Sequence, residues 1–413
     1  MFLLYDFIFF IYAVVYLPYL LVTQRAYAGY AMRFGFFPPA IKQKMGAGSN
    51  IWVHAVSVGE VAVIEGLIRG LQKQYPDYQI VATVTTKSGY ELAQQRLAGK
   101  AIVIPSPLDF SFVDHRFIRL INPKIYIVAE TEIWPNLFRA LHQRRVPIVL
   151  INGRISDGSF GRYQAVRPLL KGVLNQVSAF CMQSQRDADR IKTLGAPTGK
   201  VNVVGNVKFD DLTPAPARDL PFAKEDLLWI AGSTHPGEEA IVLDVYKKIS
   251  AKHPRWRLVL APRHIERAEE VIALVEQQGF KVVRFSRIGE YVPNAVIVVD
   301  TIGQLRSLYA LASMVFVGKS LCVGGGHNII EPAYYAKPVV VGPMMANFYD
   351  IMNNFKQGQG VIQATDMLDF ERIVLDLAGD DNKRKEAGRR AKAVIDHNQG
   401  ATQRTVGLIG KYL

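Results

Sequence analysis

Charged side chains in the first half of the chain stand where apolar runs end, at points where a strand would pass into a helix. Glu60 closes the sequence HAVSVGE, Glu130 opens ETEIWPN, and Lys208 lies in GNVKFD. A carboxylate at such a point can act as a general base, or it can merely complement the helix dipole, an effect of about 0.3–1 kcal/mol. Lys208 could neutralise a phosphate or carboxylate, or it could be an ordinary surface lysine. These residue types alone leave both interpretations open.

The second half contains motifs suited to binding anions. In GSTHPGEE (232–239), hydroxyl residues precede Pro236 in the first turn of a helix, so free backbone N–H groups can form an anion cradle. The motif is neither a dinucleotide fingerprint nor a Walker A loop, because the required glycine and lysine spacing is missing. In APRH, Arg263 could bind a phosphate with two hydrogen bonds and His264 could add a donor, although a surface turn fits equally well.

The most specific motif is GGGHNIIEP (324–332). Its glycines allow close approach to the backbone, while Asn328 and Glu331 are three residues apart and share a helix face. A carboxylate there can accept hydrogen bonds from two ribose hydroxyls. Gly303 in DTIGQL offers another close approach. Together these motifs predict a nucleotide-sugar site.

Composition excludes several other classes of protein. The chain has 413 residues, of which 49% are hydrophobic, so it is neither disordered nor of low complexity. Its only cysteines, Cys181 and Cys322, cannot form a disulfide framework and favour a reducing compartment. HExxH and paired-histidine motifs are missing and the two cysteines do not cluster, so we expect no metal cofactor. No recognisable nucleic-acid module is present, so we expect no nucleic-acid partner.

Apolar runs alternate with amphipathic stretches from residue 50 onward, which predicts βαβ units with parallel strands covered on both faces. The predicted strands are Ile51–Val56, Gln79–Thr85, Ala101–Ile104, Lys124–Val128, Pro147–Ile151, Ser178–Met182, Val201–Val204, Leu228–Ala231, Arg257–Leu260, Lys281–Arg284, Ala295–Val299, Met314–Val317 and Pro338–Val341.

A proline-rich segment over residues 211–222 divides this α/β pattern into similar halves, and we predict that it is a linker. We therefore predict two doubly wound Rossmann-like domains, residues 24–210 and 223–413, the second including a closing C-terminal helix. The predicted domains face each other across a cleft, with ligands at the carboxyl ends of the strands.

The first 22 residues are apolar except for Asp6 and Pro18. As a helix they would extend about 33 Å, enough for a hydrocarbon core of about 30 Å. Basic residues follow but none precedes, so the positive-inside tendency places the remaining chain in the cytoplasm. A helix lying in one leaflet and a cleaved signal peptide are the alternatives. We predict a membrane anchor over residues 1–23.

Positive charge is concentrated in the first half. Residues 1–210 carry 24 basic and 13 acidic side chains, whereas residues 211–413 carry 25 and 23. Just after the apolar segment, RFGFFPP (33–39) places aromatic rings beside a cation, as expected for a surface that enters lipid headgroups or for a packed connector. The charge asymmetry favours an anionic partner near the membrane.

With these motifs in view, the chain resembles the lipid A-specific 3-deoxy-D-manno-octulosonic acid (Kdo) transferases of Gram-negative bacteria. The resemblance covers nearly the whole length and rests on motifs in a fixed order: HAVSVGE, ETEIWPN, NGRISD, GNVKFD, GSTHPGEE, APRH and GGGHNIIEPA. It implies a GT-B glycosyltransferase that works without a metal, takes CMP-Kdo as donor and uses an anionic lipid A precursor (lipid IVA) as acceptor in lipopolysaccharide synthesis.

The resemblance also implies roles for individual residues. Glu60 would be the catalytic base, and Glu130 and Lys208 would support the transition state. The residues expected to hold the donor nucleotide are Pro262, Arg263, His264, Gly303, Gln304, Leu305, Asn328, Ile329, Ile330 and Glu331.

Two other functions remain open at this point. A nucleotide-sugar epimerase of similar two-domain architecture would share the His-Asn and Glu pattern, but the apolar N-terminus argues against it. A non-enzymatic, membrane-attached lipid-binding protein would leave the nucleotide-type loops unexplained.

Overall fold

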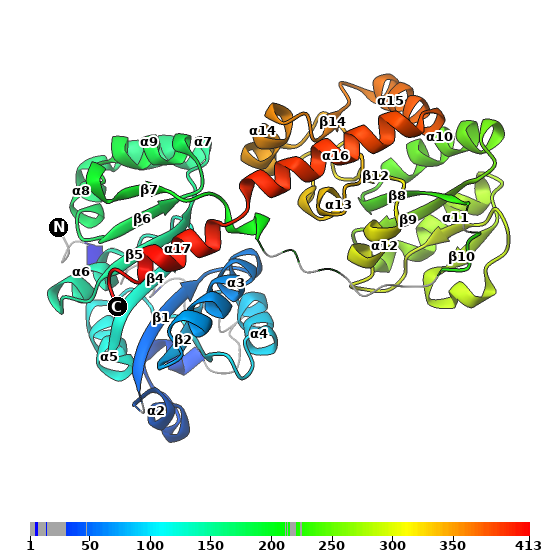
Figure 1. Cartoon of the computed structure of the whole chain (residues 1–413). Coiled ribbons are helices and arrows are strands. Elements are labelled where there is room, and N and C mark those ends of the chain that lie inside the picture. The colour runs from blue at the N-terminus through cyan, green and yellow to red at the C-terminus, as the bar shows by residue number, and fades with distance from the viewer. Residues whose placement is uncertain are drawn as a thin grey trace. The chain divides into compact units, whose positions relative to one another are not determined.

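The computed structural model of the chain forms two compact units, one of residues 1–211 with 399–413 and the other of residues 212–398 (Figure 1). It describes residues 5–6, 14, 30–46, 48–210, 212, 214, 220–223 and 225–413. Most of the predicted anchor, residues 1–23, and part of the predicted linker lie outside the described residues. Among the described residues, no helix is both long and apolar enough to cross a membrane.

The first unit is built on a seven-stranded parallel sheet in the order β3-β2-β1-β4-β5-β6-β7. The chain leaves the centre at β1, fills one side, and returns to place β4 against β1, so the strand order reverses between these two strands. Its strands are β1 (Ser49–Ala55), β2 (Tyr78–Val84), β3 (Ile102–Pro105), β4 (Pro123–Ala129), β5 (Ile148–Gly153), β6 (Ala179–Met182) and β7 (Val201–Val203).

Helices cover both faces of this sheet, because successive strand side chains point to opposite faces. In β1, Trp52 belongs to one buried core, and Ile51 and Val53 belong to the other. The helical elements of the unit are η1 (Tyr30–Phe34), α2 (Pro39–Gly46), α3 (Val58–Gln74), α4 (Lys87–Arg96), α5 (Ser111–Ile121), α6 (Pro135–Gln143), α7 (Asp157–Ala165), α8 (Arg167–Leu174), α9 (Gln185–Leu194), η2 (Thr198–Lys200), η3 (Val207–Phe209) and α17 (Ala401–Ile409).

The second unit repeats this plan with a parallel sheet in the order β10-β11-β9-β8-β12-β13-β14. Here the strand order reverses between β8 and β12. Its strands are β8 (Leu227–Thr234), β9 (Trp256–Pro262), β10 (Val282–Arg284), β11 (Val296–Val298), β12 (Met314–Val317), β13 (Val339–Val341) and β14 (Ile362–Gln363).

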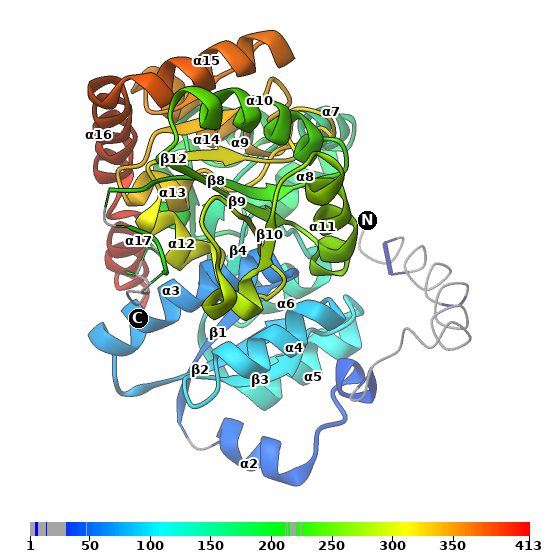
Figure 2. The same ribbon diagram turned by 90° about the vertical axis from the view of Figure 1, so that its right-hand side faces the viewer.

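Helices also cover this second sheet, and α16 packs against α13 and α14 (Figures 1 and 2). The helical elements of the unit are α10 (Glu238–Lys252), η4 (Ile265–Arg267), α11 (Ala268–Gln277), η5 (Phe285–Glu290), α12 (Leu305–Leu311), α13 (Ile330–Tyr334), η6 (Ala346–Phe348), α14 (Tyr349–Gln357), α15 (Met367–Gly379) and α16 (Asp381–Asn398).

The end of the chain differs from the prediction, which assigned all of residues 223–413 to the second domain. Residues 399–413 instead group with the first unit, where α17 packs against α3 (Figure 1). The physical reason is burial, since Ala401, Val406 and Ile409 complete the core on that face of the first sheet.

Each of the thirteen predicted strands is present, with boundaries that differ by no more than three residues. Only β14, two residues long, was not predicted, because so short a segment carries no recognisable hydrophobic period.

Candidate active site

Glu60 lies where the first sheet changes direction, in the first turn of α3 directly after β1. The side chain is folded back onto its own loop: Oε2 accepts the Val56 backbone N–H at 2.7 Å, and Oε1 accepts the Ser57 hydroxyl at 3.0 Å. The residue is only 6% exposed. A carboxylate is thus fixed at the β1–β4 reversal, the place where open parallel sheets bind ligands.

The surroundings of Glu60 make it a stronger base than an exposed glutamate. Burial, with the negative charges of Glu130 and Glu132, raises the pKa of its carboxyl to about 7. The hydrogen bonds from Val56 and Ser57 oppose it without cancelling it. A carboxyl with a pKa near the operating pH is well matched to general base catalysis.

Glu130 and Lys208, the other predicted catalytic residues, lie together. Glu130 directly follows β4 and has a left-handed backbone (φ 55°), and its N–H donates to the Ile151 carbonyl at 2.8 Å. Lys208 Nζ lies 3.8 Å from Glu130 Oε1, and both side chains are partly exposed. The charge of Glu130 also acts on Glu60. The structure therefore gathers predicted groups from three distant motifs.

Polar residues that we did not predict hold the Lys208 loop. The side-chain oxygen of Asn206 accepts the Lys208 N–H at 3.0 Å, and that of Asn152 accepts the Val207 N–H at 3.2 Å. The Asn206 amide in turn donates to Gln183 Oε1 at 2.9 Å. The sequence signals were two asparagines in quoted motifs, Asn152 in NGRISD and Asn206 in GNVKFD.

Asp109 is another residue that sequence reasoning missed. Its carboxylate accepts the Leu137 N–H at 2.9 Å and the Asn136 N–H at 3.3 Å, so it caps α6 in place of the N-cap residue Trp134, which makes no capping bond. Tyr5 also donates to it, at 2.8 Å. By fixing α6, Asp109 positions the ETEIWPN loop that carries Glu130.

In the second unit, six predicted nucleotide-binding residues line one pocket with a volume of about 280 Å³. The lining residues are Ser233, Ala261, Pro262, Arg263, His264, Ile265, Glu266, Val299, Thr301, Ile302, Gly303, Gln304 and Leu305. Gly303 has φ 84°, and a Cβ placed on it would have no neighbouring atom within 4 Å. A backbone turn therefore faces the pocket without a side chain in the way.

The predicted group Asn328–Glu331 is outside this lining but next to it. Burial raises the pKa of the Glu331 carboxyl, whereas the positive charge of Arg306, adjacent to Leu305, lowers it. The side chains of Ile329 and Ile330 are fully buried, so they contribute to the core and only their backbone could contact a ligand.

One buried carboxylate ties together the loops after β8 and β12. Glu238 is 0% exposed, and its oxygens accept four backbone N–H groups, those of His235, Lys319, Ser320 and Leu321, at 2.8–2.9 Å. At Gly318 an added Cβ would lie 2.5 Å from the Ser233 carbonyl, so only glycine allows this close approach. The GSTHPGEE motif is thus a clamp that shapes the reversal of the second sheet.

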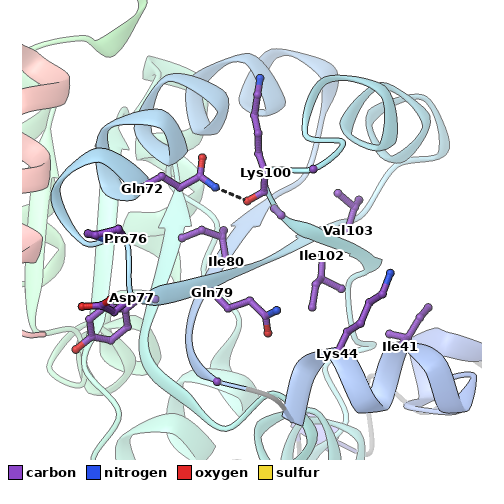
Figure 3. Close-up of a pocket in the computed structure, with 14 residues that line it drawn as sticks. Ile41, Lys44, Gln72, Pro76, Asp77, Gln79, Ile80, Lys100, Ile102 and Val103 are labelled. Atoms are coloured by element: carbon purple, nitrogen blue, oxygen red, sulfur yellow. Dashed lines mark hydrogen bonds between the residues drawn. The ribbon is translucent and has the colours of Figure 1, made fainter.

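A further groove of about 700 Å³ lies in the first unit, at the edge of the sheet opposite to the one that carries Glu60. It is formed by the amino ends of β2 and β3 and by α2 (Figure 3). Gln72 donates to the Lys100 carbonyl there at 2.8 Å, and Lys44 contributes a second lysine. None of the predicted site residues lines it. Among the described residues, no group of three or more His, Cys, Asp or Glu side chains is arranged to hold a metal ion.

Comparison with known families gives consistent results. A family model described as 3-deoxy-D-manno-octulosonic-acid transferase (Kdo transferase) matches residues 28–211. A 3-deoxy-D-manno-octulosonic acid transferase of Haemophilus influenzae is 36% identical over 397 residues, which are 93% of this chain and 91% of that protein.

Solved structures extend the comparison to the fold. MurG of Acinetobacter baumannii covers 88% of this chain and 99% of its own, with a TM-score of 0.56 and 13% identity. UDP-GlcNAc 2-epimerase of Neisseria meningitidis covers 88% of this chain and 100% of its own, with a TM-score of 0.53 and 12% identity. At such low identity these structures bear on the fold alone, and they confirm the predicted GT-B type.

Proposed function

Because the chain belongs to the 3-deoxy-D-manno-octulosonic acid transferase family and is therefore a glycosyltransferase, we propose that it moves Kdo from CMP-Kdo to a lipid A precursor, lipid IVA, in lipopolysaccharide synthesis. The observation that most supports this reaction is the buried Glu60 carboxylate, with a pKa near 7, at the reversal of the first sheet.

Glu60 acts as the general base. An acceptor hydroxyl attacks the anomeric carbon of Kdo and transfers its proton to the Glu60 carboxylate as the new glycosidic bond forms. Glu130 keeps the charge of Lys208 close to the base, because their side chains form an ion pair. Lys208 can then stabilise negative charge that develops in the transition state.

The bond from the anomeric carbon to the phosphate oxygen breaks with its electrons on CMP. Arg263 and His264, at the carboxyl end of β9, are placed to bind this leaving group, and the Gly303–Leu305 turn gives the rest of the nucleotide a pocket. In our proposal these side chains supply the positive charge, and no metal or other cofactor takes part.

We place the enzyme at the cytoplasmic face of the inner membrane, with residues 1–23 as anchor. An exposed aromatic and basic surface supports this: Phe36 and Phe112 are 60% and 68% exposed, and the Arg116 guanidinium lies 4.2 Å from the Phe36 ring centre. Arg116 follows Phe112 by four residues on α5, so both lie on one helix face. Aromatic rings beside a cation suit the headgroup region.

Family membership decides between the functions left open by the sequence. The epimerase alternative rests on structures 12–13% identical, which show the fold alone, whereas a transferase is 36% identical over nearly the whole chain. A non-enzymatic lipid-binding protein disagrees with the same relationship.

The test is to incubate the purified full chain with CMP-Kdo and lipid IVA and to weigh the lipid by mass spectrometry. We expect the unaltered protein to give lipid that is heavier by one or more Kdo residues. With the Glu60→Gln variant, we expect the mass of the lipid to stay unchanged. Release of free Kdo without any heavier lipid would contradict the proposed acceptor, and epimerised nucleotide sugar would contradict transfer.

A further inference from the structure

Two histidines meet at the reversal of the second sheet. His235 follows β8, and His327 comes from the glycine-rich loop after β12. Their Nε2 atoms are 2.9 Å apart, and their rings are stacked with centres 5.2 Å apart. The His264 ring lies edge-on to His235 at 5.8 Å. The family roles carried over from the sequence resemblance include neither His235 nor His327.

When both rings of such a pair are neutral, a single proton lies between the two Nε2 atoms. Two ring nitrogens at hydrogen-bond distance need one N–H donor and one bare acceptor. Burial, together with positive charge from Arg263, His235, Lys319 and His264, lowers the pKa of His327 to about 4. The pKa of His235 is lowered in the same way. At neutral pH and without an anion beside them, the two histidines are therefore uncharged, but the pair can gain a proton.

The charged groups that face the pair leave a surplus of positive charge. Glu238, the carboxylate beside His235, already accepts four backbone N–H groups. Arg267 is bound to Glu239 at 2.8 Å and to Glu270 at 2.9 Å. The structure places no carboxylate in ion-pair contact with Arg263 or Lys319 among the described residues. An anion would complete this cluster.

The cluster adjoins the nucleotide pocket. Arg263 and His264 line that pocket, and the Arg263 N–H donates to the Thr234 carbonyl, one residue before His235, at 3.0 Å. Gly326 fixes the other side, because its N–H donates to the Lys319 carbonyl at 2.7 Å and its φ is 72°. The pair is thus held rigidly beside the space predicted for the nucleotide.

We propose that His235 and His327, flanked by Lys319 and Arg263, form the subsite for the phosphate of the donor nucleotide. This inference rests on the proposed function, because the phosphate belongs to CMP. Once a phosphate lies beside the pair, its negative charge favours the form in which one ring is a protonated imidazolium and each Nε2 carries a proton that it can donate. Filling the subsite therefore takes up one proton, and affinity falls as pH rises, at most tenfold per pH unit.

The test is calorimetric titration of the full chain in detergent with CMP and with cytidine, which lacks the phosphate. His327→Gln and His235→Gln should weaken CMP binding about tenfold or more while leaving cytidine binding unchanged. His397→Gln, an exposed histidine on α16, is the matched control and should bind both ligands normally.

Two further readouts make the outcome decisive. Repeating the CMP titration in buffers of different ionisation enthalpy should show a proton uptake in the unaltered protein that both variants lose. CMP affinity should also be measured between pH 6 and 8 for each variant and for the unaltered protein. The ratio of the two affinities is independent of the ionisation of CMP itself. We expect this ratio to approach one as the pH rises. Variants that bind CMP like the unaltered protein would overturn the phosphate subsite alone, whereas an unaltered protein that binds neither ligand would overturn the proposed function.

Discussion

The environment of Glu60 predicts the pH dependence of the enzyme. A general base works only when ionised, and burial raises the pKa of this carboxyl to about 7. We therefore expect kcat/KM for the acceptor, measured at saturating CMP-Kdo, to fall about tenfold for each pH unit below 7 and to level off above it. Initial rates between pH 5.5 and 8.5 measure this limb. A rate that is flat down to pH 5.5 would contradict the assigned base.

A neighbouring carboxylate offers a test of the same idea without touching the base. The negative charge of Glu132 is one of the causes that raise the pKa of Glu60. Glu132→Gln should lower this pKa and shift the acid limb of the rate profile to lower pH. Glu91→Gln, on the exposed side of α4, is the matched control and should leave the profile in place.

Glu238 shows how a single buried side chain can define a binding loop. Glu238→Gln replaces one acceptor oxygen by an NH2 group that faces backbone N–H donors. Losing charge-assisted bonds of this kind costs about 1.5–3 kcal/mol, so thermal unfolding should move to lower temperature. Asp244→Asn, exposed on the same helix, should leave the unfolding temperature unchanged. Equal unfolding temperatures for the two variants would contradict the clamp.

At the scale of elements, the sequence predicts what local patterns determine. Buried parallel strands are continuous apolar runs, and strands such as β4 and β12 stand out for that reason. Glu60 and Arg263 could be found because chemistry in such sheets collects at the carboxyl ends of strands. Local patterns therefore located both halves of the candidate site.

Contacts between segments far apart in the sequence could not be predicted from those local patterns. Nothing near Asp109 indicates that it caps α6, and nothing near His235 indicates that His327 lies 2.9 Å away. The amphipathic pattern of α17 likewise indicates a buried face without naming the sheet that buries it. These features depend on tertiary packing, which sequence periodicity does not encode.

The return of α17 to the first unit predicts an effect of Asp210. Its carboxylate accepts the backbone N–H groups of Gly400 and Thr402 at 2.6 and 2.5 Å, and so caps α17. Asp210→Ala should cost about 0.5–2 kcal/mol, and limited proteolysis should cleave the last fifteen residues faster. Asp189→Ala, an exposed residue of α9, is the control. Unchanged cleavage would mean that the cap does not hold the helix.

At the scale of the whole molecule, the net positive charge and the exposed aromatic surface both lie in the first unit. Residues 1–210 hold most of the net positive charge, and the first unit also presents Phe36 and Phe112. An acceptor that is both anionic and embedded in a membrane would be attracted by the charge and reached through the aromatic surface. The second unit, nearly neutral, binds the soluble donor in our proposal.

This division predicts that the aromatic surface matters only when the acceptor lies in a membrane. Changing both Phe36 and Phe112 to Ser removes two rings, each worth up to about 1.5–3 kcal/mol when buried. We expect KM for lipid IVA in anionic vesicles to rise about tenfold or more, while KM for the same lipid in detergent stays unchanged. Leu368→Ser, 82% exposed in the second unit, should alter neither value. Equal KM increases in vesicles and detergent would instead assign the two rings to the acceptor site itself.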